Sequence, residues 1–125
     1  MSLRVANGAG FWGDNLDAPR RLVETAEVDY LTLEYLAELT LSIMARQREK
    51  DPAAGSATDF VQVLGSLCPA LAAQPQLKIV TNAGGMNVAP CAQAAARILV
   101  DAGMPAVKIG VLTGDDLSQR RGVQR

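Results

Sequence analysis

Acid–base chemistry in this chain must depend on carboxylates, lysines or tyrosines, because its 125 residues include no histidine. Three carboxylates stand out by their position. Asp14 ends a glycine-rich stretch, while Glu34 and Asp115 follow short apolar runs. Each lies where a strand is expected to give way to a loop, which is where α/β proteins hold their ligands. We predict that these three carboxylates supply any proton transfer.

The glycine-rich stretch matches the G-x-G-x-x-G pattern of dinucleotide-binding loops through Gly8, Gly10 and Gly13. In such loops the glycines let the backbone approach a pyrophosphate, which rests on the N-terminus of the next helix. Glu34 follows Gly13 by about 20 residues, the spacing of the acid that binds the ribose. These features define an NAD-binding domain as one alternative.

Three side chains in the same region argue against a pyrophosphate. Asp14 and Asp17 would repel it at the helix entry, and Trp12 is bulky where the backbone should come close. Glycine is also the usual residue wherever a turn needs a positive φ. We interpret the stretch as a ligand-binding loop and name no cofactor.

A second glycine-rich turn covers residues 81–87, with the sequence Thr-Asn-Ala-Gly-Gly-Met-Asn. It lacks the lysine of a phosphate-binding P-loop, which removes support for nucleoside triphosphate hydrolysis. Its amides could instead hold an anion or an acyl carbonyl, and its last residue suits the N-cap of a helix. A further turn at residues 113–116 follows the last expected strand. From these three segments and the end of the first strand, the predicted ligand-binding residues are Asn7, Gly8, Gly10, Gly13, Asn82, Gly84, Gly85, Asn87 and Gly114.

A metal site is the less favoured interpretation of the acidic residues. Asp14, Asp115 and Asp116 offer the oxygen ligands that Mg²⁺ takes. Aspartate is equally common in turns and at helix caps. We therefore predict no metal site.

Apolar runs and stripes predict alternating strands and helices. Strands are expected at residues 3–6, 28–33, 77–80 and 107–112. Helices are expected from Asp17, from Glu34, from Thr58 or Asp59, and from Asn87 to Gly103, with Pro69 kinking or ending the third. Their predicted buried faces are Leu22, Val23 and Ala26; Leu36, Leu39, Ile43 and Met44; Phe60, Leu64, Leu67 and Leu71; and Cys91, Ala95, Ile98 and Ala102.

This alternation predicts an α/β, Rossmann-like fold with a parallel sheet of about four strands and helices on both faces. Unusual residues follow every predicted strand. Parallel strands place their carboxyl ends at one edge of the sheet, so these residues are expected to form a single site. We assign residues 1–117 to the domain and residues 118–125 to a polar tail.

Charge and composition exclude several function classes. Twelve Lys and Arg balance 13 Asp and Glu, for a net charge of −1, so nucleic acid binding has no electrostatic basis. No apolar stretch approaches the roughly 20 residues of a membrane span, and no signal pattern begins the chain. Cys68 and Cys91 lack the spacing of a zinc site or a disulfide frame and are interpreted as core thiols. We expect a cytoplasmic protein.

Four segments in order, residues 4–14, 29–38, 78–87 and 113–116, resemble the N-terminal region of the acyclic terpene utilisation (AtuA) family. The resemblance extends to about Leu117. It implies a bacterial, cytosolic protein of acyclic terpene catabolism, acting on CoA thioesters such as those derived from citronellol and geraniol. A small-molecule ligand, an acyl-CoA or another oxygen-rich compound, is the partner that it implies.

Members of that family usually run to several hundred residues, so we expect this chain to be an incomplete domain. A parallel strand needs cover on both faces, and the polar tail offers little apolar surface for it. Two further alternatives therefore stay open beside the ligand-binding domain. One is a non-catalytic interaction module, and the other is a fragment that needs a partner, either another copy or a missing C-terminal region.

Overall fold

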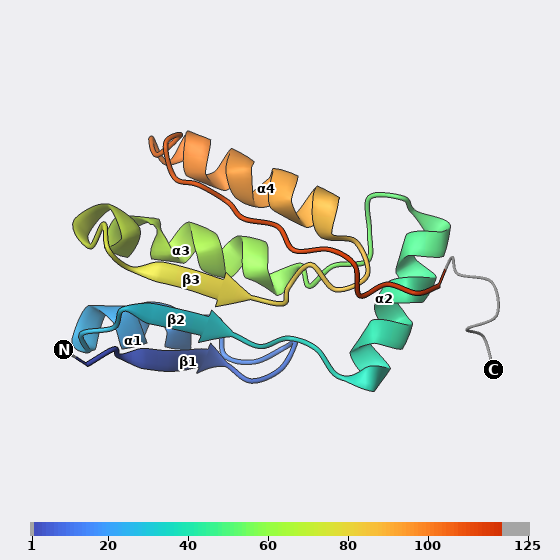
Figure 1. The fold of residues 1–125 in the computed structure, drawn as a ribbon, viewed down its shortest axis with the longest axis horizontal. Helices are drawn as coiled ribbons and strands as arrows, with labels where there is room; N and C mark the ends of the chain where they lie inside the picture. The colour runs from blue at the N-terminus through green and yellow to red at the C-terminus, as the bar shows by residue number, and fades with distance from the viewer. Residues whose placement is uncertain (1, 119–125) are drawn as a thin grey trace.

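The computed structural model describes residues 2–118, which form a three-stranded parallel sheet and four helices (Figure 1). The strands are β1 (Val5–Ala9), β2 (Tyr30–Leu33) and β3 (Lys78–Thr81), in the order β1-β2-β3. The helices are α1 (Ala18–Thr25), α2 (Glu38–Lys50), α3 (Asp59–Ala73) and α4 (Val88–Asp101). The α/β class predicted from the sequence is confirmed.

The helices that pack on the sheet lie on one of its faces. Leu31 and Leu33 of β2 are fully buried on that face, while Tyr30 and Thr32 on the opposite face are half-buried. α1 and α3 lie behind the strands in Figure 1, and α4 packs beside α3. Because each right-handed crossover advances in the same direction across the sheet, every crossover helix falls on the same face. The expectation of helices on both faces is not met within residues 2–118.

The first strand extends further than expected. It runs from Val5 to Ala9 and pairs with β2 in a register that shifts between Asn7 and Ala9. Asn7 and Gly8 therefore lie in the strand and not in the loop after it. The local shift turns the end of β1 at the point where a ligand-binding loop was predicted.

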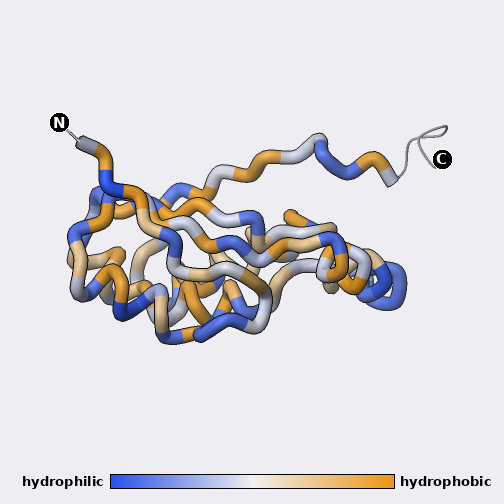
Figure 2. Tube along the Cα trace, turned by 90° about the horizontal axis from the view of Figure 1, so that it is seen from below, coloured by the Kyte–Doolittle hydropathy of each residue, from blue (hydrophilic) through white to orange (hydrophobic). Residues whose placement is uncertain are grey.

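The expected fourth strand is absent from the sheet within the described part of the chain. Residues 107–112 are extended, but they pair with no strand, and Val107, Ile109 and Val111 are 43%, 40% and 50% exposed. We call residues 105–116 the strap. Figure 2 shows it running apart from the rest of the chain, with both apolar and polar residues along its length.

The predicted helix faces hold for α3 and in part elsewhere. Phe60, Leu64 and Leu67 are buried, and α3 continues through Pro69 to Ala73. In α4 the buried residues are Cys91, Ala95 and Leu99, whereas Ala102 is exposed.

The prediction for α2 was wrong in two respects. The helix begins at Glu38, after Glu34 and not at it, and Met44 is its buried residue, while Leu39 and Ile43 are 71% and 41% exposed. The reason is its place in the fold. α2 crosses beyond the carboxyl ends of the strands and does not lie on the sheet (Figure 1).

Candidate functional site

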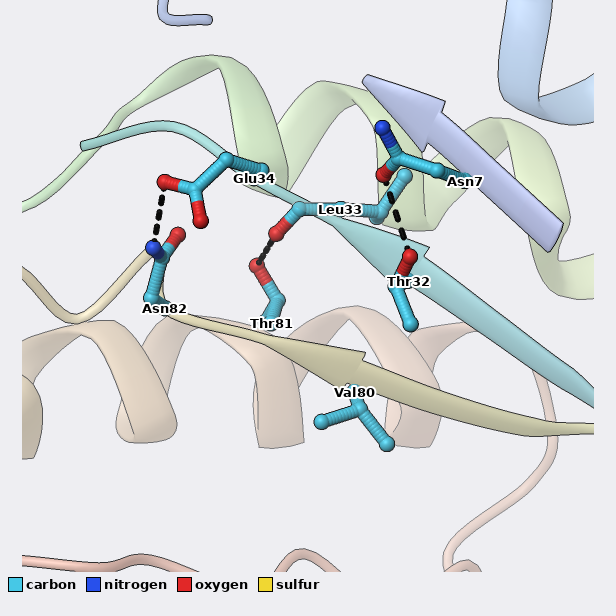
Figure 3. A pocket seen from close by; sticks show the side chains of 7 residues that line it. All are labelled: Asn7, Thr32, Leu33, Glu34, Val80, Thr81 and Asn82. Atoms are coloured by element: carbon cyan, nitrogen blue, oxygen red, sulfur yellow. Dashed lines mark hydrogen bonds between the residues drawn. The ribbon is translucent and has the colours of Figure 1, made fainter. Parts of the chain in front are cut away.

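A cavity of about 400 Å³ lies at the carboxyl ends of the three strands (Figure 3). All three strands contribute to it, as expected for a parallel sheet. Its lining consists of Asn7, Thr32, Leu33, Glu34, Val80, Thr81 and Asn82. The structure thus brings together three of the predicted site residues, Asn7, Glu34 and Asn82, which are far apart in the sequence.

Asn82 fixes Glu34 at one wall of this cavity. Its Nδ2 donates a hydrogen bond to Glu34 Oε1 at 2.5 Å, and its Oδ1 accepts one from the backbone N–H of Tyr35 at 2.9 Å. Glu34 Oε1 also accepts from the backbone N–H of Leu36 at 2.8 Å. Among the described residues, the second oxygen, Oε2, makes no hydrogen bond. Glu34 is exposed, so this oxygen is the free acceptor of the site.

Two threonines complete the polar wall. Thr32 donates to Asn7 Oδ1 at 3.0 Å, and Thr81 donates to the carbonyl oxygen of Leu33 at 2.8 Å (Figure 3). Asn7 is thereby oriented through its oxygen, and its amide nitrogen makes no hydrogen bond among the described residues. Neither threonine was predicted as a site residue. The available signal was the polar position inside the otherwise apolar second strand, two residues before Glu34.

Backbone N–H groups of the glycine-rich loop donate to two carboxylates, one from the loop itself and one from α3. Gly10 N–H donates to Asp14 Oδ2 at 2.9 Å, and Gly13 N–H donates to Asp59 Oδ2 at 2.9 Å. The hydrogen bond from Gly10, followed by one from Asn15, lowers the pKa of Asp14. Asp14 is therefore held ionised as a brace of its loop.

This arrangement disfavours a pyrophosphate. Two N–H groups that would donate to its oxygens already donate to carboxylates, and those carboxylates add negative charge at the loop. The NAD-binding alternative loses its main structural support, because the fingerprint is present in sequence while its donors are occupied.

Close packing accounts for three of the predicted ligand-binding glycines. A Cβ at Gly8 would lie 3.2 Å from the backbone of Pro19, where α1 crosses β1. A Cβ at Gly84 would lie 2.9 Å from Val88. Gly85 has φ +55° and lies against Met44, so this position needs a residue that adopts a left-handed backbone and has no side chain.

Asn87 and the turn at residues 113–116 lie away from the cavity. The Asn87 side chain donates to the carbonyl oxygens of Pro52 and Ala54 at 2.7 and 2.8 Å, which pins a distant loop. Asp115 lies on the strap beside a different, larger groove. Gly114 is exposed, with φ +118°. Their binding roles stay predictions.

No three acidic, cysteine or histidine side chains converge as metal ligands within residues 2–118. Asp116, one of the three residues weighed for Mg²⁺, is 3.0 Å from Arg48 in an ion pair. This ion pair holds the end of the strap against α2.

A buried tyrosine lies beneath the site. The Tyr35 side chain is buried, and its hydroxyl has no hydrogen-bond partner among the described residues. Burial first, and then the charges of Asp59 and Asp14, raises the pKa of Tyr35 to about 12. The phenol thus stays protonated at neutral pH and contributes no base.

The two cysteines are core thiols, as predicted. Cys68 and Cys91 are both free and buried, and burial raises the pKa of each. Neither forms a disulfide or offers a reactive thiolate at neutral pH.

Comparison with known proteins adds a family to this geometry. Across the part of the chain that the structure describes, no helix is long and apolar enough to cross a membrane. The sequence matches neither a curated protein nor a solved structure. The model of the acyclic terpene utilisation family protein AtuA matches residues 3–124, nearly the whole chain. This chain therefore belongs to the AtuA family.

Proposed function

We propose that this chain binds the acyl and pantetheine part of a CoA thioester at the strand-end cavity, in acyclic terpene utilisation. Family membership supports the pathway. The ligand class is supported by one observation, the convergence of Asn7, Glu34 and Asn82 on a single cavity. An amide donor and a carboxylate acceptor side by side match the carbonyl and amide groups of such a ligand.

The charges around the cavity favour the uncharged part of the ligand. Glu34 lies in its wall, and Asp14 and Asp59 brace the neighbouring loop. A phosphate placed among them would be repelled. An acyl carbonyl could instead accept a hydrogen bond from the Asn7 amide, and an amide N–H of the ligand could donate to Glu34 Oε2.

If the bound thioester reacts, Glu34 is the best placed base of the three predicted carboxylates. Its Oε2 is free among the described residues, whereas both oxygens of Asp14 accept backbone hydrogen bonds. Asp115 lies outside the cavity lining. Asn82 would act as a positioning residue, because it holds the other Glu34 oxygen.

Binding can be tested by thermal unfolding and calorimetry of the 125-residue chain with geranyl-CoA, free CoA, NAD(H) and Mg²⁺. A ligand that binds only the folded state raises the midpoint. Geranyl-CoA is expected to raise it more than free CoA does. Glu34→Gln is expected to weaken geranyl-CoA at least about tenfold, as removal of a charged hydrogen-bond acceptor does.

The matched control is Glu49→Gln, which removes the same charge from an exposed position on α2. It should bind as the unchanged protein does. Equal loss in both variants would reduce the effect to net charge. Binding of NAD(H) in preference to the thioester would restore the dinucleotide alternative.

A non-catalytic interaction module is the second candidate, and exposed apolar surface favours it. Leu39 and Ile43 are exposed on α2, and the strap exposes Val107, Ile109 and Val111. A mass that rises with concentration in light scattering would support this function. A monomer at all concentrations would count against it.

A further inference from the structure

A groove of about 1160 Å³ lies between the strap and the body of the molecule. Its floor is apolar and comes from three elements, with Ile79 and Val80 from β3, Leu64 and Leu71 from α3, and Cys91, Ala95 and Leu99 from α4. α4 stands beside α3 in the helix layer, yet no strand lies in front of it within residues 2–118 (Figure 1). A further strand next to β3 would occupy this groove.

The outer edge of β3 is free among the described residues, because β3 pairs with β2 alone. An unpaired edge presents a row of backbone N–H and C=O groups. The strap runs along the groove in the same direction as β1, β2 and β3 (Figure 1). Between Lys108 and Asp115 its backbone makes no hydrogen bond to the rest of the described chain. Two sets of unpaired backbone groups therefore face the same space.

The strap has the alternation of an edge strand. Val107, Ile109 and Val111 share one side, and Lys108, Gly110 and the 92% exposed Leu112 share the other. A period of two places the three apolar residues together on one face when the backbone is extended. This pattern fits a groove that is apolar at the helix side and open to water at the other.

Both ends of the strap are already fixed. At its start Met104 N–H donates to the carbonyl oxygen of Leu99 at 2.8 Å, which follows the end of α4. At its other end Asp116 pairs with Arg48 of α2 at 3.0 Å. Closure therefore requires a lateral movement of the segment between these anchors.

We propose that residues 107–112 close onto the free edge of β3 as a fourth parallel strand, with Val107, Ile109 and Val111 filling the groove. The connection through α4 would then be a right-handed crossover that advances in the same direction as the preceding two. Closure converts the open, three-stranded sheet into a four-stranded sheet. The strap is the element that differs between these two states.

Closure also acts on the candidate site. It would place Gly114 and Asp115 just after a strand end, at the same edge of the sheet as Asn82. Asp115 would then join Glu34 at the mouth of the cavity, a consequence that rests on the proposed function.

Backbone hydrogen exchange of the ligand-free 125-residue chain tests closure without reference to any ligand. The amides of residues 107–112 are expected to exchange at least about tenfold more slowly than in an unfolded peptide. Ile109→Asp should remove this protection, because it places a charge in the apolar groove. Lys108→Asp is the matched control, since an extended backbone places residue 108 on the opposite side from Ile109, and it should retain the protection.

Unprotected amides in the unchanged chain would overturn the proposal. Equal effects of Ile109→Asp and Lys108→Asp would also overturn it, because residues 108 and 109 would then not face opposite sides of a strand. Protection that depends on protein concentration would assign the groove to the strap of a second copy, against closure within one chain. None of these outcomes bears on whether geranyl-CoA binds, so the two proposals fail separately.

Discussion

Replacing Gly85 by alanine tests whether this loop is built for packing or for binding. A Cβ at Gly85 would overlap the Met44 sulfur and lie 3.0 Å from the carbonyl oxygen of Gly55. Met44 is fully buried, so its side chain must repack against its neighbours to make room. The residue also has φ +55°, which costs a residue with a side chain roughly 1–2 kcal/mol. Overpacking of a core adds about 1–3 kcal/mol, so the free energy of unfolding should fall by about 2–5 kcal/mol.

Two other glycines separate these contributions. Gly103 has φ +78°, and no heavy atom lies within 4 Å of the position that a Cβ would take there, so Gly103→Ala should cost only the backbone contribution of roughly 1–2 kcal/mol. Gly65 lies inside α3 with open space around it, and Gly65→Ala should stabilise the protein by about 0.5–1 kcal/mol. Urea unfolding followed by circular dichroism gives all three values on one scale.

Agreement of Gly85→Ala and Gly103→Ala within about 0.5 kcal/mol, the usual scatter between independent sites, would show that packing against Met44 adds no cost. The double variant Met44→Ala/Gly85→Ala provides a further check. Removing the Met44 side chain makes room for the new methyl group, so the two substitutions should cost less together than the sum of their separate effects. Simple additivity would show that Met44 does not impose the constraint.

Two further predictions follow from the buried phenol and from the anchor of the strap. Tyr35→Phe removes a buried hydroxyl that has no partner among the described residues, so urea unfolding should show no loss of stability or a gain of about 1 kcal/mol, whereas a loss of that size would reveal a partner. The Asp116 pKa is lowered from 3.8 to about 2, chiefly by hydrogen bonds from Ser118 and then by Arg48, so docking of the strap end favours the ionised carboxylate. Its contribution is complete above about pH 4 and is lost as the pH falls through about 2, and NMR signals of residues 113–118 should shift over that interval. Asp116→Asn should abolish this transition, and an unchanged transition in that variant would assign it to another group.

Local signals in the sequence were sufficient to predict most elements and part of the site. Short apolar runs located β2 and β3 to within a few residues, and the stripe of Phe60, Leu64 and Leu67 located α3. The rule that ligands bind beyond the carboxyl ends of parallel strands brought Asn7, Glu34 and Asn82 into one prediction. The cavity in the structure joins the same three residues.

The errors concern what lies next to each element, which periodicity does not encode. The stripe of α2 has the spacing of a buried face, but Leu39 and Ile43 are exposed because the helix crosses beyond the sheet. The alternation of residues 107–112 is that of a strand, yet strand formation needs a partner edge as well as a pattern. The glycine fingerprint indicates backbone freedom at the loop and gives no information about Asp59. That residue, 46 positions further along the chain, accepts the hydrogen bond of the Gly13 N–H.

The strand order β1-β2-β3 has a consequence for how the chain folds during synthesis. The unit β1-α1-β2 leaves the ribosome before α3, but the core that holds Leu31 also contains Leu67 of α3. Until residues up to Ala73 have emerged, the apolar face of the sheet lacks the cover that α3 provides. We therefore expect nascent chains that end before α3 to depend on chaperones, and chains that extend past it to become resistant to protease.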